Sequence, residues 1–331
     1  MAGATGGVPA EVLNGDTADV YFHRARQILE REGLNPVVVM EVFAGRAGVL
    51  CGVEECLQLF RQVLPPGSEV WGLQEGDDVA GREVALRIRA PFQSFALYET
   101  AYLGYLSQPS GWATAARECV AAAGDVPVIS FGARHVHPAV ATVLEHAAVV
   151  GGCGGCATVG GARRTGKRPS GTMAHAMVLI FGDTVRAAEA FDRWIEPEVP
   201  RVALVDTLRD EAEESLRVAA ALGPRLAAVR LDTPVERGRV TPALVKEVRA
   251  RLDQAGYPWV KVFVSGGVNP QRIREFREAA APVDGFGVGS YVSAASPIDF
   301  TADIHEIDGR PVAKRGRIPG LTPAPRLQRL L

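Results

Sequence analysis

The sequence predicts an α/β protein whose larger part alternates short parallel strands with helices. Short apolar runs end in polar residues and are followed by amphipathic stretches. The run ends at Asp206, Asp232, Ser265 and Gly289 lie about 25 to 33 residues apart, the size of a strand–helix unit. Such strands form a parallel sheet buried on both faces. We favour a barrel over an open doubly wound sheet, because no dinucleotide-binding fingerprint accompanies the units.

The first third of the chain has a different pattern, with strands that are not separated by regular helices. The helices predicted there cover Asp19–Glu30, Phe92–Leu106 and Trp112–Ala123, and the strands cover Val37–Phe43, Glu69–Leu73 and Val84–Ala90. We therefore predict a small α/β domain over residues 1–111, completed by residues 298–331. A barrel domain follows over residues 112–297.

Composition excludes several classes of protein. The 331 residues carry a net charge of −2, so no global field favours nucleic acid. No apolar run reaches the length of a membrane span, and the flexible N-terminus, Met1–Val20, lacks a signal-peptide pattern. The five cysteines indicate reduced thiols and a cytoplasmic protein. Cys153 and Cys156 lack a second ligand pair at suitable spacing, so no metal site is predicted.

Glycine and serine collect at the ends of the last two predicted strands. Glycine lets backbone N–H groups approach an anion, and the N-terminus of a following helix adds positive charge. Barrel enzymes often bind phosphate in the loops that follow their last two strands. The alternative is that both loops are ordinary tight turns. We expect one phosphate to be held by Ser265, Gly266, Gly267, Gly287, Gly289 and Ser290.

Carboxylates end the two preceding strands. Asp206 and Asp232 would bind ribose hydroxyls or the waters of a magnesium ion, or they would only cap the helices that follow. Arg230 and Asp232 alternate with Leu231 along one strand, so both side chains would face the barrel mouth.

Two further segments carry polar and aromatic side chains that could bind a ligand. "FGARHVHP" contains Phe131, Arg134 and His137, of which Arg134 would grip a carboxylate through two hydrogen bonds. The alternatives are a structural ion pair for Arg134 and an exposed position for His137. "SGTMAH" adds Thr172 and His175, a hydroxyl and an imidazole that follow a basic, glycine-rich stretch.

These motifs together resemble one family. The segments "TADVYF", "ISFGARHVHPA", "PSGTMAHAM", "VRLDTP", "VFVSGGV" and "VAKRGRI" follow in the order found in nicotinate phosphoribosyltransferase, and the short bacterial and archaeal form is the most similar. The resemblance covers residues 17–319. It implies transfer of phosphoribose from phosphoribosyl pyrophosphate (PRPP) to nicotinate, which yields nicotinate mononucleotide and pyrophosphate in NAD salvage. It also implies an irregular, incomplete α/β barrel of the type II phosphoribosyltransferase kind beside a smaller α/β domain.

The resemblance also implies roles for residues. Phe131 and Arg134 would contact the pyridine acid with Thr172 beside it, and Arg230 and Asp232 would hold base and ribose. Homodimers of the family share active sites, so Asp19 and Tyr21 would reach the site of the partner. His175 matches the histidine that ATP phosphorylates in family members that couple catalysis to ATP hydrolysis.

The resemblance places phosphates near the C-terminal basic stretch, residues 309–331. Lys314, Arg315 and Arg317 would face them there, although a solvated basic tail is the alternative. Magnesium would accompany the pyrophosphate.

Two features depart from the family pattern. Family members commonly continue beyond the position of Leu331, and the segment "GGCGGCATVGGARRTG" holds a second cysteine and the pair Arg163–Arg164, which have no assigned role. An altered loop suits a related heteroaromatic acid, so a phosphoribosyltransferase for such an acid stays an alternative. A non-catalytic protein that binds PRPP and nicotinate is another. Quinolinate phosphoribosyltransferase is similar in fold, but its motif pattern is not found, so decarboxylation is not expected.

Overall fold

The computed structural model describes residues 7–331, and the chain divides into two compact units. Of the described residues, 7–114 and 295–331 form the first, here named the antiparallel unit, and residues 115–294 form the second, the parallel unit. The expectation for the N-terminal stretch falls partly on residues 1–6, which lie outside the described residues.

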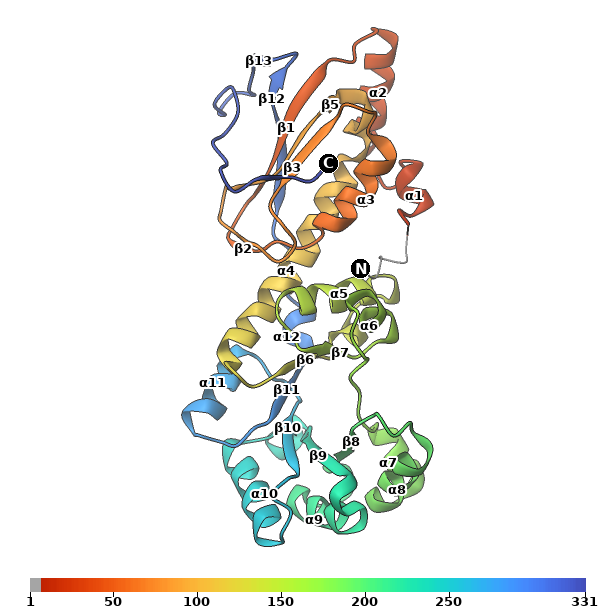
Figure 1. Ribbon diagram of the computed structural model, residues 1–331, viewed down its shortest axis with the longest axis vertical. Coiled ribbons are helices and arrows are strands. Elements are labelled where there is room, and N and C mark those ends of the chain that lie inside the picture. The colour runs from red at the N-terminus through yellow and green to blue at the C-terminus, as the bar shows by residue number, and fades with distance from the viewer. Residues whose placement is uncertain (1–6) are drawn as a thin grey trace. The chain divides into compact units, whose positions relative to one another are not determined.

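The antiparallel unit is built on a six-stranded sheet in the order β13-β12-β1-β5-β3-β14. Both ends of the chain contribute to it, because β12 pairs with β1 and β14 pairs with β3. Helix α3 and the first part of α4 pack their apolar side chains on one face of this sheet (Figure 1). The elements are α1 (Ala10–Leu13), α2 (Val20–Arg31), β1 (Val37–Ala44), β2 (Gly48–Val49), α3 (Val53–Val63), β3 (Glu69–Gly72), β4 (Asp78–Val79), β5 (Val84–Pro91), η1 (Phe92–Ser94), η2 (Ala96–Tyr98), β12 (Phe300–Ile307), β13 (Arg310–Pro311) and β14 (Gln328–Arg329).

The prediction of two helices over residues 92–123 is wrong, because α4 (Glu99–Ala123) runs without a break through Pro109. Proline lacks an N–H group, so the carbonyl of Tyr105 loses its helical hydrogen bond. That carbonyl oxygen lies 1.8 Å from the position that a Cβ atom on Gly52 would occupy. Gly52, with a φ of +99°, thus closes over the interrupted turn at a place where no larger residue fits.

The parallel unit confirms the predicted incomplete α/β barrel. Its six strands are all parallel, in the order β7-β6-β11-β10-β9-β8, and the end strands β7 and β8 do not pair with each other. The strands are β6 (Val128–Ser130), β7 (Gly155–Cys156), β8 (Arg201–Leu204), β9 (Leu226–Leu231), β10 (Lys261–Val264) and β11 (Gly285–Val288). The helices are η3 (Gly132–His135), α5 (Pro138–Val150), α6 (Val159–Thr165), α7 (His175–Phe181), α8 (Thr184–Trp194), α9 (Glu211–Leu222), η4 (Gly223–Arg225), η5 (Val235–Arg237), α10 (Pro242–Gln254), α11 (Pro270–Glu278) and α12 (Ser290–Ser293).

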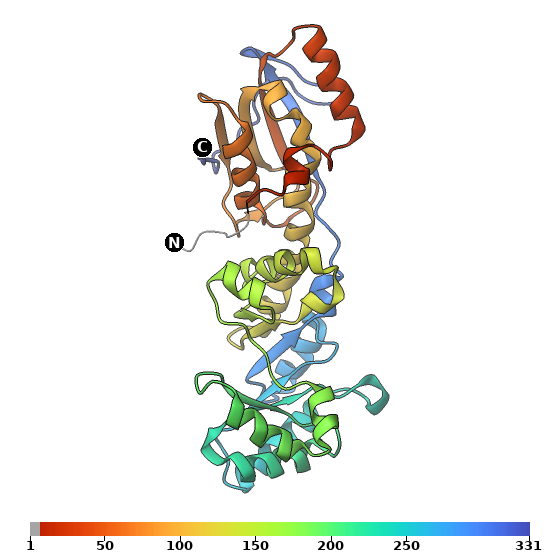
Figure 2. The same cartoon turned by 90° about the vertical axis from the view of Figure 1, so that its right-hand side faces the viewer.

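Helix starts in the parallel unit follow the local sequence. Asp210, Thr241 and Asn269 each accept a backbone N–H bond in the first turn of α9, α10 and α11. Each of these helices therefore begins at a capping residue in the loop that follows the strand before it, and Figure 2 shows the parallel unit's helices, in green to blue, beside its strands. Asp206 and Asp232 cap none of these helices, so the capping alternative for both is wrong.

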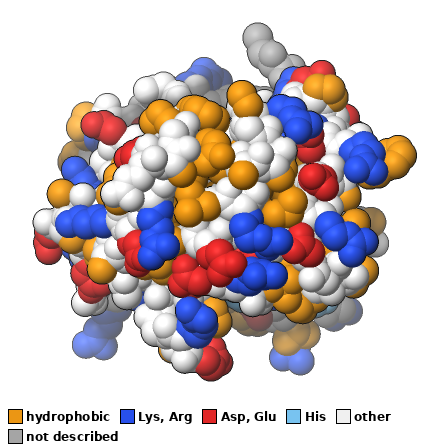
Figure 3. Space-filling view, turned by 90° about the horizontal axis from the view of Figure 1, so that it is seen from below, with side chains coloured by type: hydrophobic (Ala, Val, Ile, Leu, Met, Phe, Trp, Pro, Cys, Tyr) orange, Lys and Arg blue, Asp and Glu red, His pale blue; other side chains and the backbone are white. Residues whose placement is uncertain are grey.

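The surface carries both signs of charge. On the face in Figure 3, Lys and Arg side chains lie among Asp and Glu side chains rather than in one patch. Within residues 7–331, none of the helices combines the length and the hydrophobicity that crossing a bilayer requires. All five cysteines are buried free thiols, and burial raises the pKa of Cys156 to about 11.

Candidate functional site

A cluster of polar side chains lies at the carboxyl ends of the central strands. Arg230 on β9 is its centre: Nη1 donates to Oγ1 of Thr172 at 2.6 Å, and Nη2 donates to Oδ2 of Asp232 at 2.8 Å. Its guanidinium carbon lies 5.7 Å from the centre of the Phe131 ring. Two residues that the sequence predicted near the substrate, Phe131 and Thr172, thus hold one arginine in place.

Asp232 links this arginine to the next strand end. Its Oδ1 accepts a hydrogen bond from Oγ of Ser265 at 2.9 Å, and Nε2 of His175 lies 3.5 Å from its Oδ2. The other ring nitrogen of His175 lies 2.9 Å from Oγ1 of Thr207. The imidazole is therefore oriented from both sides, while 41% of its side chain stays exposed.

Asp206 is the buried acid of the cluster. Its Oδ2 accepts the backbone N–H of Asp232 at 3.2 Å, but its buried Oδ1 has no hydrogen-bond partner among the described residues. Burial raises the pKa of Asp206, His175 counteracts the rise, and the neighbouring carboxylate of Asp232 adds to it. An under-solvated acid of this kind suits a site that receives a cation or a hydroxyl.

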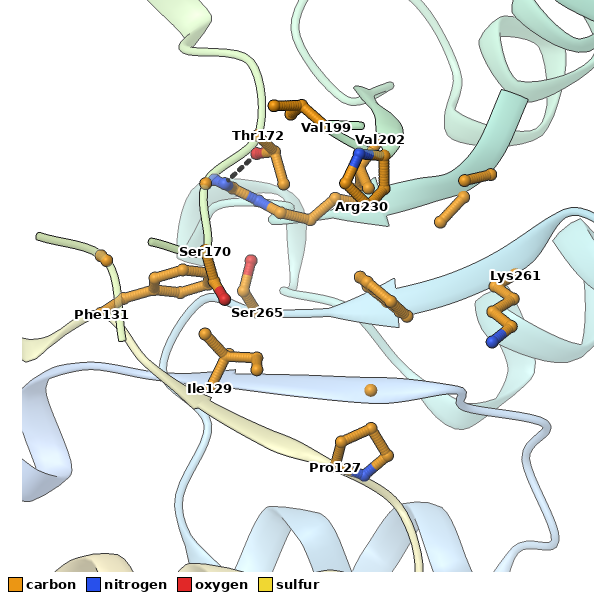
Figure 4. Close-up of a pocket in the computed structure, with 18 of the residues that line it drawn as sticks. Pro127, Ile129, Phe131, Ser170, Thr172, Val199, Val202, Arg230, Lys261 and Ser265 are labelled. Atoms are coloured by element: carbon orange, nitrogen blue, oxygen red, sulfur yellow. Dashed lines mark hydrogen bonds between the residues drawn. The ribbon is translucent and has the colours of Figure 1, made fainter. Parts of the chain in front are cut away.

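A cavity of about 940 Å³ opens along the inner face of the parallel sheet. Figure 4 shows Phe131, Ser170 and Ser265 gathered at one end with Arg230 reaching toward Thr172, while Lys261 lies at the other end. The walls between are mainly apolar, because strands that do not close into a barrel leave their inward side chains uncovered. A flat aromatic ring beside Arg230 would fill only part of this space.

The two predicted glycine loops differ. Gly266 and Gly267 have φ of +81° and +65°, and their N–H groups have no hydrogen-bond partner in the described chain, so this loop is open to an anion. Gly287 is buried in β11, and a Cβ atom there would lie 2.4 Å from the Phe131 ring. Its lack of a side chain thus makes room for the aromatic ring. Gly289 and Ser290 lead into the four-residue helix α12, with Ser290 exposed.

Two predicted contacts with the aromatic acid lie apart from this cavity. Arg134 is exposed in η3 and does not line the cavity, so the guanidinium beside the Phe131 ring belongs to Arg230 instead. His137 is exposed, and its Nδ1 accepts the N–H of Ala139 at 3.2 Å as the cap of α5. The alternative of an exposed, structural His137 accounts for this position.

The remaining predicted residues belong to the antiparallel unit. Asp19 accepts a hydrogen bond from Thr100 Oγ1 at 3.0 Å just before α2, and Tyr21 is 57% exposed on that helix. Nζ of Lys314 and Nε of Arg317 lie 2.5 and 2.8 Å from the carboxylate of Asp303, so both cations have an internal partner. Arg315 is exposed between them.

Sequence reasoning missed a buried acid that supports the site. Glu145 of α5 is fully buried and accepts hydrogen bonds from Ser130 Oγ and from the N–H groups of Ala157 and Thr158. It thereby joins the end of β6, just before Phe131, to the loop after β7. A lone glutamate in a helix gives no sequence signal, whereas Thr207 could have been found as the hydroxyl directly after Asp206.

Comparison with known proteins places these features in a family. The domain model described as quinolinate phosphoribosyl transferase, C-terminal domain, matches residues 112–303, and the corresponding N-terminal domain model matches residues 19–110.

The chain belongs to the quinolinate phosphoribosyltransferase family.

The motif-based exclusion of the quinolinate enzyme therefore does not extend to its family, whose two-domain plan this member shares.

Relatives of this family member carry more than one name. A nicotinate phosphoribosyltransferase of Mycobacterium tuberculosis is 36% identical over 230 residues, 69% of this chain and 48% of that protein, so the chain spans about half the length of the curated relatives it matches. A structure named nicotinate-nucleotide pyrophosphorylase from Pyrococcus furiosus is 44% identical with a TM-score of 0.88, covering 97% of this chain and 82% of the other. Human nicotinic acid phosphoribosyltransferase, 19% identical with a TM-score of 0.72 over 92% and 77% of the two chains, shares the fold.

We predict that Asp206→Asn stabilises the protein at neutral pH. The pKa of Asp206 is higher in the folded protein than in the unfolded chain. Ionisation of Asp206 therefore lowers the free energy of unfolding as the pH rises through the folded-state pKa, and it has no effect below the pKa of the unfolded chain. Urea denaturation should give the variant a higher free energy of unfolding than wild type at pH 7.5, with the difference shrinking toward pH 4.5. Asp125→Asn, at an exposed position, is the control and should show no such pH dependence. A destabilised variant at pH 7.5 would contradict the prediction.

Proposed function

We propose that this protein transfers phosphoribose from PRPP to nicotinate, giving nicotinate mononucleotide and pyrophosphate in the cytoplasm. One observation supports this above all: a guanidinium beside an aromatic ring adjoins a carboxylate–serine pair and a loop with free N–H groups. These groups match, in order, a pyridine carboxylate, ribose hydroxyls and a phosphate.

The pyridine acid would lie against Phe131. Its carboxylate would pair with Arg230, whose Nε is buried and has no hydrogen-bond partner among the described residues. Thr172 and Asp232 hold the other guanidinium nitrogens, so the arginine is oriented before substrate arrives. One guanidinium beside the ring suits an acid with one carboxylate. Arg134, exposed and outside the cavity, is left free for the charged groups of PRPP.

The sugar would bind at the ends of β9 and β10. Asp232 would accept hydrogen bonds from ribose hydroxyls, and the 5′-phosphate would take the N–H groups of Gly266 and Gly267. Gly289 and Ser290 would approach the phosphate from the next loop. The proposed phosphate ligands also include Lys314, Arg315 and Arg317. Lys314 and Arg317 would leave Asp303 and pair with a phosphate of the substrate instead.

The reaction is a displacement at C1 of the ribose. The ring nitrogen forms a bond to C1 while the bond to pyrophosphate breaks, and positive charge builds on the sugar as negative charge builds on the leaving group. Asp206 and Asp232 place negative charge near the sugar, whereas Phe131 and Arg230 aim the nitrogen. Such alignment can contribute roughly 7 to 11 kcal/mol in the best intramolecular cases.

Magnesium and ATP are proposed as accessory groups. Mg²⁺ prefers oxygen ligands, and Asp206 offers a buried oxygen without a partner next to Asp232, so these acids would hold the ion or its waters. When bound it would neutralise charge on pyrophosphate. His175, which is 41% exposed with one nitrogen held by Thr207, would be the site that ATP phosphorylates.

We further propose a homodimer or larger oligomer with shared sites. No residue of α2 is buried, and Val20, Tyr21 and Ile28 are each more than half exposed on it. An apolar helix face of this kind suits a second copy of the chain. Asp19 and Tyr21 would then complete the partner's base site.

A second candidate is transfer to a different pyridine acid. The relative that is 44% identical carries the name nicotinate-nucleotide pyrophosphorylase rather than that of the curated relatives. Arg168 also lines the cavity and would be available to a second carboxylate. A protein that binds these ligands without turnover is the non-catalytic alternative.

Incubating the purified protein with PRPP, Mg²⁺ and a panel of pyridine acids tests the proposal. We expect pyrophosphate release to be fastest with nicotinate and no carbon dioxide to form from quinolinate. If another acid is turned over faster than nicotinate, that acid is the substrate and the proposal for nicotinate is wrong. Binding of both substrates by calorimetry without pyrophosphate release would instead favour the non-catalytic alternative.

We predict that Arg230→Gln raises the KM for nicotinate about 10- to 100-fold, because a charge-assisted hydrogen bond to the carboxylate is lost. Arg134→Gln should change this KM far less, since Arg134 lies outside the cavity. Steady-state kinetics with saturating PRPP measures both. A larger rise in the KM for nicotinate in Arg134→Gln than in Arg230→Gln would show that Arg134 binds the carboxylate.

We predict that His175→Ala abolishes stimulation by ATP but leaves slow, PRPP-driven transfer, because phosphorylation would assist the displacement rather than perform it. Pyrophosphate release with and without ATP measures the effect. Thr207→Val, which removes the hydroxyl beside Nδ1, should weaken the stimulation without removing it. Loss of basal transfer in His175→Ala at saturating substrate would refute this role.

A further inference from the structure

Arg239 lies in the loop between β9 and α10 in a conformation that arginine rarely adopts. Its φ is +65°, in the left-handed region that favours glycine, and its N–H donates to the carbonyl of Pro234 at 3.1 Å. The residue before it is Gly238, but the left-handed position at 239 is held by an arginine rather than by a glycine. Strained backbone positions of this kind are concentrated at functional sites.

The side chain of Arg239 reaches the loop that follows β10. Its Nη1 lies 2.8 Å from the position that a Cβ atom on Gly267 would occupy. Gly267 itself has a φ of +65°, a backbone angle that favours glycine, and the atom that approaches it is the end of a flexible side chain. The guanidinium thus rests against the loop whose N–H groups at Gly266 and Gly267 have no partner in the described chain.

The charge of Arg239 is also uncompensated. Across residues 7–331, its guanidinium forms no hydrogen bond or ion pair, whereas Arg230 is held by Thr172 and Asp232. Arg237, two residues earlier, lies 3.9 Å from the carboxylate of Glu211. Arg239 is therefore the cation of this loop that is free to meet an anion.

The loop between β10 and α11 consequently has two unlike sides. The position of a Cβ atom on Gly266 lies 3.0 Å from Oδ1 of Asp232, and that on Gly267 lies 2.8 Å from Arg239. A phosphate is repelled by the carboxylate and attracted by the guanidinium. A sugar phosphate would therefore lie with its hydroxyls toward Asp232 and its phosphate toward Arg239.

We propose that Arg239 is a ligand of the 5′-phosphate, which it clasps together with the N–H groups of Gly266 and Gly267. The planar guanidinium offers two parallel N–H groups to two phosphate oxygens, an arrangement that lysine cannot reproduce. This inference rests on the proposed function for the identity of the sugar phosphate. As a site for a phosphate monoester it stands on the loop geometry and charge.

Arg239→Gln tests the proposal, with Arg237→Gln as the matched control. We expect Arg239→Gln to raise the KM for PRPP about tenfold or more, to leave the KM for nicotinate nearly unchanged, and to flatten the salt dependence of PRPP binding. Arg239→Lys should fall between wild type and Arg239→Gln. Arg239→Gly, which relieves the backbone, should lose PRPP affinity without losing thermal stability.

Ribose 5-phosphate supplies a readout that needs no turnover. Its binding, measured by calorimetry, should weaken in Arg239→Gln and stay at the wild-type value in Arg237→Gln. Equal binding by all three proteins would overturn the proposal, even if wild type transfers phosphoribose to nicotinate. If wild type binds ribose 5-phosphate through Arg239 but turns over no pyridine acid, the proposed function fails and the phosphate ligand stands.

Discussion

The site depends on the ion pair between Arg230 and Asp232, which lie two residues apart at the end of β9. Strand geometry puts both side chains on the inner face, while Leu231 between them is fully buried on the other. Each partner forms one more hydrogen bond: Arg230 donates to Thr172, and Asp232 accepts from Ser265. Without Asp232 the partly buried guanidinium would keep only Thr172 as a hydrogen-bond partner, so the pair sets both the orientation of Arg230 and the charge of the proposed ribose site.

An unclosed sheet makes room for that pair to act. In a complete barrel, inward side chains fill the interior. Here β7 and β8 stay unpaired with each other, and small inward residues such as Gly285 and Gly287 leave a cavity along the strands. Gly287 also lets the Phe131 ring pack closely against β11. The same absence of side chains therefore creates both the space for an aromatic ligand and the surface against which it would lie.

Much of the site followed from strand ends and glycine spacing, but assignments that depended on side-chain direction did not. Arg134 and His137 were predicted to contact the substrate because of the motif that contains them. Both are exposed, and His137 caps a helix. Whether a turn residue points inward depends on how η3 closes over β6, which residue types do not reveal. Glu145 was not predicted for a related reason, since its three hydrogen bonds reach the end of β6 and the loop after β7, which come near it only in the folded chain.

The sequence by itself determined the alternation of buried strands and capped helices, because apolar periodicity and local caps act over a few residues. It likewise determined that Asp232, Ser265 and the glycine loops meet, since parallel strands end at one edge. Tertiary structure decided that the helix continues through Pro109, where the carbonyl of Tyr105 packs against Gly52. It also decided which basic side chains are paired, since Lys314 and Arg317 contact Asp303, whereas Arg239 forms no ion pair among the described residues and lies against the loop at Gly267. Those contacts join residues 11 to 28 positions apart, which is beyond the reach of helix or strand periodicity.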